Sequence, residues 1–232
     1  VNVLDRFEGG NITWALSECL LVDGDRVFVT AGGRQALMAA LDVESGDTIW
    51  ASEPLLLGES SDPRQQRVSE PEGRADRAGY ASPILVRIGS HRMIVGISQK
   101  HVFGVEARSV LAARHSVIAA TPALIGDSLF FTAPNAGGGK SFRILHSASA
   151  VTVERHWTTP LDTCHGCLIY RNGTLYGSWY RHKPRGWAAV DASNGSVLYD
   201  DTTMAMGSVI WAEERLYCLS QEGEMALIKP TP

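Results

Sequence analysis

Short apolar runs separated by glycine-containing turns make up most of this chain. In Leu20 to Trp50, two apolar strands flank an Asp-Gly turn, and a third strand leads through a Ser-Gly turn to a closing aromatic residue. Glycine supplies the positive φ that tight hairpin turns require, so the pattern predicts β-hairpins. Helical repeats are disfavoured because the runs are short, β-branched or aromatic, and lack apolar residues at i, i+3 and i+4.

Variants of this pattern recur down to the C-terminus. The first turns of the five copies lie at Gly24, Gly89, Gly126, Gly173 and Glu214, which are 65, 37, 47 and 41 residues apart by subtraction. A repeat of about 40 to 45 residues with four short strands is typical of a propeller blade. We therefore expect a single all-β domain over residues 1–232, a β-propeller with blades over about 11–51, 79–115, 118–158, 163–200 and 206–228.

Two other segments complete this predicted architecture. Val1 to Phe7 alternates apolar and polar residues, so residues 1–8 are expected to add the outermost strand that the last blade lacks and to remove an open sheet edge. Residues 52–79 are rich in Glu, Arg, Ser and Pro and mix both signs of charge, which favours a surface loop over a charged interaction tail.

Composition limits the classes of partner. The net charge is −4 and the pI about 6.0, without the clustered Lys and Arg that nucleic acids and phospholipid surfaces require. No apolar run approaches the length of a membrane span. The chain begins with Val rather than Met, which is compatible with removal of a leader or of preceding blades.

The closing segments resemble the PQQ-like (pyrroloquinoline-quinone-like) β-propeller repeat. The pattern Ala-x-Asp-x-x-[Ser/Thr]-Gly-x-x-x-Trp is carried best by Ala40 to Trp50 and, with a final Tyr, by Ala189 to Tyr199. The resemblance implies that the closing aromatic packs between adjacent blades. It also suggests an exported bacterial protein, so we expect a periplasmic or extracellular location.

The same resemblance raises the question of a cofactor. Quinoprotein dehydrogenases of this family have larger propellers, a calcium ion beside the quinone, a catalytic Asp and often adjacent cysteines over the cofactor. This sequence has only five repeats and no adjacent cysteine pair, and no carboxylate set can be placed at one channel mouth. We expect no cofactor, no catalytic residue and no metal site, with PQQ and calcium as the alternative.

Cysteines offer the densest local cluster of reactive groups. Cys164-His165-Gly166-Cys167 has the spacing of a disulfide or of two ligands to one metal, but no second such pair exists and Leu168 replaces the His of a c-type haem site. Packed thiols or a short disulfide are favoured over a metal or redox site. Cys19 and Cys218 fall in predicted strands and are expected to be small buried hydrophobes.

Two further sets of residues are candidates for ligand binding. Innermost strands line a propeller's channel, so the residues that begin each blade are expected near its mouth, where they could bind a small polar ligand or simply line a water-filled channel. This set is Trp14, Glu18, Tyr80, Ser82, Thr121, His165 and Ser208. The second set lies in the aromatic and basic loop 179–187, which could bind a protein partner or pack its Trp residues on its own blade: Trp179, Tyr180, Arg181, Arg185 and Trp187.

These observations favour a non-catalytic binding or scaffold propeller domain that takes a protein or a small polar ligand at one face. The alternatives are a fragment of a PQQ-dependent dehydrogenase and a carbohydrate- or peptide-binding module. The sequence leaves open whether the protein is an enzyme, and the fold alone would not decide it, since propellers host many unrelated activities.

Overall fold

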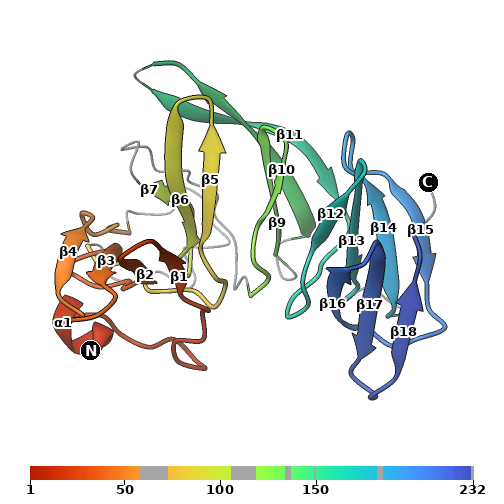
Figure 1. Cartoon of the computed structure of the whole chain (residues 1–232), viewed down its shortest axis with the longest axis horizontal. Helices are drawn as coiled ribbons and strands as arrows, with labels where there is room; N and C mark the ends of the chain where they lie inside the picture. Colours follow the sequence, from red (N-terminus) through yellow and green to blue (C-terminus); the bar gives the residue numbers. More distant parts are fainter. Residues whose placement is uncertain (58–72, 106–118, 134–136, 149, 182–184, 231–232) are drawn as a thin grey trace. The chain divides into compact units, whose positions relative to one another are not determined.

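Antiparallel β-sheets dominate the structure, a computed structural model (Figure 1). The structure describes residues 1–57, 73–105, 119–133, 137–148, 150–181 and 185–230. They form five sheets and fall into two compact units. The first unit contains residues up to 85 and residues 93–105, and the second contains residues 86–92 and those from 119 onward.

The first unit begins with a short helix, α1 (Val3–Phe7), and continues into a four-stranded sheet. The strands follow one another in chain order as a meander: β1 (Leu21–Asp23), β2 (Arg26–Thr30), β3 (Met38–Asp42) and β4 (Thr48–Ala51). The second sheet, of which residues 86–92 belong to the second unit, is also a meander and has three strands: β5 (Ile84–Ile88), β6 (His91–Ile97) and β7 (Val102–Val105).

The second unit contains the remaining three sheets, again with strands paired in chain order. The third sheet has β8 (Ala123–Ile125), β9 (Ser128–Ala133), β10 (Gly138–His146) and β11 (Val151–Thr159). The fourth has β12 (Ile169–Arg171), β13 (Thr174–Ser178), β14 (Trp187–Asp191) and β15 (Val197–Asp201). The fifth has only β16 (Gly207–Ala212), β17 (Arg215–Ser220) and β18 (Met225–Ile228).

One aromatic position recurs in the packing of the sheets. The third residue of the second strand is Phe28 in the first sheet, Phe130 in the third and Tyr176 in the fourth. Each is buried in a core with residues of the sheet that follows: Phe28 with Phe103, Phe130 with Val190, and Tyr176 with Leu216. Three hydrophobic cores of the described residues therefore lie between successive sheets of one unit, as expected for propeller blades: between the first and second, the third and fourth, and the fourth and fifth.

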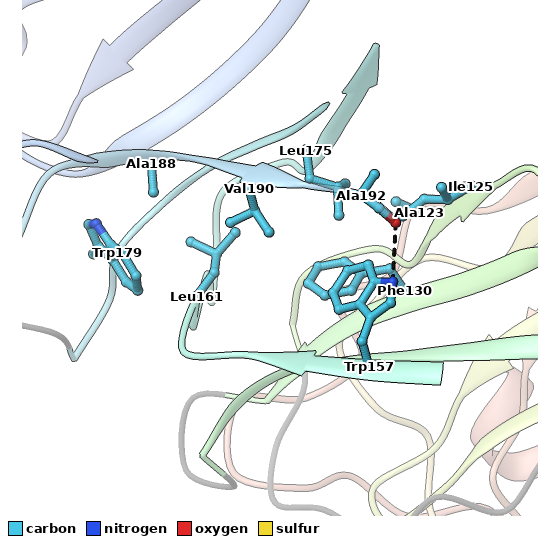
Figure 2. Packing of buried hydrophobic residues seen from close by; sticks show 10 residues of the cluster. All are labelled: Ala123, Ile125, Phe130, Trp157, Leu161, Leu175, Trp179, Ala188, Val190 and Ala192. Carbon is cyan, nitrogen blue, oxygen red and sulfur yellow. Dashed lines mark hydrogen bonds between the residues drawn. The ribbon is translucent and has the colours of Figure 1, made fainter. Parts of the chain in front are cut away.

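The core between the third and fourth sheets is drawn in Figure 2. The closing aromatic of the third sheet, Trp157, is 8% exposed, and its indole nitrogen donates a hydrogen bond to the Ala192 carbonyl across 3.1 Å. Its ring lies 5.2 Å from that of Phe130, centroid to centroid. This residue therefore joins adjacent sheets through both packing and a hydrogen bond.

The N-terminal segment differs from the sequence prediction. Residues 3–7 form helix α1 rather than an outer strand, because Asn2 caps them: its side-chain oxygen accepts hydrogen bonds from the backbone nitrogens of Leu4 and Asp5. Val3 and Phe7, four residues apart, lie on one helix face and pack on Val29 and other residues of the first sheet. The helix therefore covers a face of the first sheet.

Trp50 corrects the expectation that every closing aromatic is buried. Its side chain is 36% exposed, and all four residues of strand β4 are exposed. The repeat pattern identifies the position along the strand, but burial depends on which neighbouring sheet covers it. Trp157 has such a cover, whereas the described residues bury Trp50 only in part.

The predicted surface loop 52–79 is also partly wrong. Residues 58–72 lie outside the described part of the chain. On either side of them the backbone pairs with itself, since the Leu57 nitrogen donates to the Arg74 carbonyl across 2.9 Å. Residues that follow this pairing are buried, with Ala75 8%, Asp76 1% and Ala78 2% exposed. A stretch of charged composition thus contains a structural element that its composition did not reveal.

Candidate binding surfaces

An exposed tryptophan is held near the start of the first sheet. Trp14 is 71% exposed and its ring lies 5.6 Å from that of the buried Tyr80, with the planes tilted by 56°. Its backbone nitrogen donates to the Tyr80 hydroxyl across 3.1 Å, and the Cys19 nitrogen donates to the Ser82 hydroxyl across 2.9 Å. The structure therefore brings Trp14 and Tyr80 together as one aromatic surface, with Ser82 used for local support.

Glu18, the one acid predicted near the channel mouth, serves the backbone. Its carboxylate accepts a hydrogen bond from the Thr30 nitrogen across 2.7 Å, at the end of strand β2. Burial raises the pKa of the Glu18 carboxyl above its usual range, and the hydrogen bond from Thr30 opposes that shift. Its structural role is to cap a strand end.

Sequence reasoning missed a second buried acid with a similar role. Asp76 accepts hydrogen bonds from the Ser98 hydroxyl across 2.5 Å and from the Lys100 nitrogen across 3.2 Å, and it pairs with Nδ1 of His101 at 2.7 Å. Ser, His and Asp are all present, but the serine bonds to the carboxylate instead of the imidazole. A nucleophilic triad needs the serine on the imidazole, so this cluster is a structural clamp.

Asp162 is the third acid of this kind and controls the aromatic and basic loop. It is 5% exposed, and its two carboxylate oxygens accept hydrogen bonds from the backbone nitrogens of Tyr180, across 2.8 Å, and Arg181, across 2.7 Å. Backbone donors on both oxygens fix the path of the chain just beyond strand β13. The acid lies in the connection that leads into the fourth sheet, so only the tertiary fold reveals the pairing.

The side chains that Asp162 positions form a polar surface with His165. The His165 and Tyr180 rings meet edge to face with centroids 5.3 Å apart, and the guanidinium carbon of Arg181 lies 5.7 Å from the centre of the Tyr180 ring. His165 and Arg181 are exposed, whereas Tyr180 is half-buried. His165 of the predicted channel mouth thus lies beside Tyr180 of the predicted loop, which also carries Arg181 over its ring. We call His165, Tyr180 and Arg181 the His165 surface.

The rest of the loop divides between core and solvent. Trp179 is 1% and Trp187 6% exposed, so of the two alternatives that the sequence left open, packing inside the protein applies to both tryptophans. The Trp187 indole donates to the Ala205 carbonyl across 2.9 Å, which ties the loop to the connection before β16. Arg185 is exposed, and residues 182–184 lie outside the described part of the chain.

The last two residues of the predicted channel mouth are isolated from this surface in their contacts. Thr121 is half-buried just before strand β8, and Ser208 is exposed on β16, opposite Leu219 of β17. Among the seven predicted residues, Trp14 therefore lies with Tyr80 in the first unit. In the second unit, His165 lies with Tyr180 of the aromatic and basic loop.

The cysteines behave differently from one another. All four are free thiols; Cys164 and Cys218 are buried, while Cys19 and Cys167 are exposed, which corrects the predicted burial of Cys19. Burial raises the pKa of Cys164 to about 11, and the nearby Asp162 charge adds to this shift. The Cys164 sulfur lies 3.7 Å from Nε2 of His165. Packed thiol therefore describes Cys164, whereas Cys167 faces solvent.

Buried hydroxyl side chains mark the end of the second strand in every sheet, a regularity that sequence reasoning also missed. The Ser178 hydroxyl donates to the Gly207 carbonyl across 2.8 Å, and the Thr132 hydroxyl donates to the Thr163 carbonyl. The first bond joins the end of β13 to the first residue of β16, and the second joins β9 to the connection that leads into β12. The series is Thr30, Ser98, Thr132, Ser178 and Ser220.

The donor groups do not fit a quinone with calcium. Among the described residues, no group of three His, Cys, Asp or Glu side chains could hold a metal ion. The half-buried Glu18 and the buried Asp76 and Asp162 are committed to protein donors: Glu18 to Thr30, Asp162 to the loop, and Asp76 to its own cluster. Calcium needs six to eight oxygen ligands, several of them carboxylates. We therefore derive no step through such a cofactor.

Comparison with known proteins supports the fold. No protein-family model and no curated protein sequence matches the chain. Among solved structures, BamB from Moraxella catarrhalis, a β-propeller, is 12% identical with a TM-score of 0.56, over 89% of this chain and 61% of BamB. A quinohemoprotein alcohol dehydrogenase from Pseudomonas putida HK5 is 13% identical over 93% of this chain and 40% of its own length, but its TM-score is only 0.48.

These likenesses bear on the fold alone. The chain spans about three fifths of the length of BamB, since 61% of that chain is covered. No helix among the described residues is long and apolar enough to cross a membrane. The meander sheets, the cores between successive sheets and the likeness to BamB together show that the fold is a β-propeller built of about five blade-like sheets.

Proposed function

We propose that this propeller is a non-catalytic binding domain and that the His165 surface is where it recognises a partner. The observation that carries the proposal is the pair of hydrogen bonds from Tyr180 and Arg181 to Asp162. They fix the backbone that carries a half-buried aromatic ring and an exposed cation before any ligand arrives. A surface that is already ordered avoids part of the entropy cost of binding.

The chemistry of this surface favours an anionic partner. Arg181 presents a guanidinium, which binds carboxylates through paired hydrogen bonds, and the Tyr180 ring beneath it restricts its orientation. His165 adds an imidazole at the other edge of the tyrosine ring. An acidic peptide segment or a small polar carboxylate suits these groups, in agreement with the partner classes that the sequence indicates.

Catalysis is less well supported because the available acids already have structural partners. Glu18, Asp76 and Asp162 each accept hydrogen bonds from the protein, and the buried Cys164 thiol has a pKa of about 11. A general acid or base must reach its substrate, and a thiol nucleophile must ionise. The three acids are engaged within the protein and do not reach a substrate, and the thiol is neutral near neutral pH.

Carbohydrate or peptide binding at a second place has an observation of its own. Trp14 is 71% exposed and is held against Tyr80, which leaves one broad aromatic face in water. Exposed aromatic anchors of this size are typical of binding sites. We keep this as the second candidate function. The proposal includes a periplasmic or extracellular location, which follows the resemblance of the repeats.

A binding titration tests the main proposal. The probe is a fluorescein-labelled peptide of alternating Asp and Glu, followed by anisotropy at low salt. Arg181→Gln should raise the dissociation constant roughly tenfold or more, because it removes a charge-assisted contact. The matched control is Arg171→Gln, since Arg171 is also exposed and lies 5.4 Å from the ring centre of Trp211. An equal loss in both variants, or no binding to the unaltered protein, would contradict the proposal.

A further inference from the structure

The fifth sheet leaves one apolar face uncovered. Ile210 of β16 is 59%, Leu219 of β17 47%, and Met225 and Leu227 of β18 are 69% and 55% exposed. The strand register places Ile210 beside Tyr217 and Tyr217 beside Leu227, so these residues form one continuous patch. We call this patch the Ile210 face. A cluster of large apolar side chains on one sheet face is typical of an interaction surface.

The Ile210 face has the same pattern of residues as sheet faces that are buried elsewhere in the chain. Tyr217 is the third residue of its second strand, the position of Phe28, Phe130 and Tyr176. Ile210 pairs with Tyr217 across the strands as Ile169 pairs with Tyr176. In the fourth sheet, that pair packs against Val209, Leu216 and other residues of the fifth. The fifth sheet repeats the pair but has no described sheet against it.

The described part of a second copy of this chain does not offer a free matching face. The face of the first sheet that carries Val29 and Leu41, opposite to the Phe28 side, is covered by Val3 and Phe7 of helix α1. The corresponding faces of the second, fourth and fifth sheets are buried in the cores that contain Phe103, Val190 and Leu216. In the third sheet, the side chains that flank Phe130 on the other face, Leu129 and Phe131, are each 1% exposed. A head-to-tail contact between copies would therefore have to displace α1.

Charge disfavours pairing of two identical Ile210 faces. Glu213 and Glu214 form the turn at one end of strand β17, and Glu222 and Glu224 lie in the turn at its other end. All four are exposed. Two copies packed face to face would bring these acidic ends close together, where like charges repel.

We propose that the Ile210 face binds one further antiparallel β-sheet of the blade type, which lies outside residues 1–232. Its contacting face would carry aliphatic residues such as Leu, Val and Ala, because those residues receive the aromatic side chain within this chain. The contact would continue by one step the packing already made between successive sheets. It is separate from the His165 surface and does not depend on the binding function proposed for that surface.

An extended chain tests this inference. A second copy of residues 191–230 is joined after Ile228, which supplies the missing fourth strand and then a sheet whose Leu216 face can cover the Ile210 face. Ile210→Glu is introduced into the original copy only, in both the 1–232 chain and the extended chain. The control is Ile49→Glu, because Ile49 is likewise an exposed strand isoleucine, at 43%, but on β4.

Melting temperature, sedimentation velocity and limited proteolysis give the readout. In the 1–232 chain, both substitutions should shift the melting temperature by no more than about 2 °C, because both sites are exposed. In the extended chain, Ile210→Glu should lower it by roughly 5 °C or more, since a charge is then buried without a partner, whereas Ile49→Glu should not.

Four results would overturn the inference. Ile210→Glu could be equally harmless in both chains, or the added segment could be digested as fast as unfolded polypeptide. Ile210→Glu could lower the melting temperature as strongly in the 1–232 chain, which would mean that the chain already covers this face itself. Finally, the 1–232 chain could be a dimer that Ile210→Glu dissociates, which would assign the face to a second copy.

Discussion

The Ser178 hydroxyl donates a hydrogen bond to the Gly207 carbonyl across 2.8 Å, from the end of strand β13 to the start of strand β16. The Ser178 carbonyl in turn accepts a hydrogen bond from the Thr163 hydroxyl across 2.8 Å. Polar groups therefore link the connection before the fourth sheet, the fourth sheet itself and the fifth sheet. Because Ser178 is 5% exposed, water does not readily replace its bond to Gly207.

Ser178→Ala should lower the free energy of unfolding by about 1 to 3 kcal/mol, because the Gly207 carbonyl loses its side-chain donor inside the protein. The control is Ser208→Ala, a change at an exposed serine on β16 that should stay within about 0.5 kcal/mol. Urea denaturation of both variants measures the difference. Equal stability of the two would show that the bond between β13 and β16 contributes nothing.

Truncation should cost much more stability at one closing tryptophan than at the other. Trp157→Ala should cost about 3 to 5 kcal/mol, because the ring is 8% exposed and its hydrogen bond to Ala192 is lost as well. Trp50→Ala should cost under about 1 kcal/mol, since that ring is 36% exposed. Denaturant unfolding of both variants gives the comparison. A larger loss at Trp50 would restore the burial that the sequence suggested.

Trp157 and Trp50 show which features of the fold the sequence predicts and which it does not. Turn glycines and strand periodicity predicted the strand–turn–strand units, and Gly173 follows Asn172 in the tight turn between β12 and β13, both with positive φ. Burial of Trp157 but not of Trp50 depends on neighbouring sheets, which local patterns do not encode. At the N-terminus, Val3 and Phe7 fit both an alternating strand and a helix face, and the capping residue Asn2 decides between the two.

The candidate site was predictable only in pieces. His165, Tyr180 and Arg181 stood out as chemistry-bearing residues, but in two separate sets. Asp162, which holds the loop, was not singled out because its partners are 18 and 19 residues further along the chain. Asp162 belongs to no recognisable sequence motif, so its contact with the loop is seen only in the folded structure.

The turn between β16 and β17 should tolerate glycine better than its native residue. Glu213 and Glu214 have φ values of 49° and 57°, a left-handed conformation that costs roughly 1 kcal/mol or more for a residue with a Cβ. Glu214→Gly should therefore raise the free energy of unfolding by about 0.5 to 1 kcal/mol, since the corresponding position of the fourth sheet is Gly173. Thermal and urea unfolding measure the gain, and a loss of stability would contradict the assigned turn geometry.

Stability should fall in alkaline solution through the buried thiols. Burial raises the pKa of Cys218 to about 11 from an ordinary value near 9.0, so the folded state favours the neutral thiol. A group with a raised pKa contributes stability below its unfolded pKa and loses that contribution as the pH rises, here from about 9 to about 11. Cys218→Ala should have a shallower decline over this window in urea unfolding. Identical slopes would show that Cys218 ionises as freely in the folded protein as in the unfolded chain.

The most direct test of the binding account is a double-mutant cycle between Asp162 and Arg181, read as affinity for the acidic peptide. In this account Asp162 acts on the ligand by positioning the loop, so Asp162→Asn should weaken binding of the peptide. When Asp162→Asn is added to a protein that already carries Arg181→Gln, the affinity should fall little further. Circular dichroism confirms that each variant remains folded at the titration temperature. The account predicts a coupling energy of about 1 kcal/mol or more. Fully additive losses, or an Asp162→Asn variant that binds as tightly as the native protein, would contradict it.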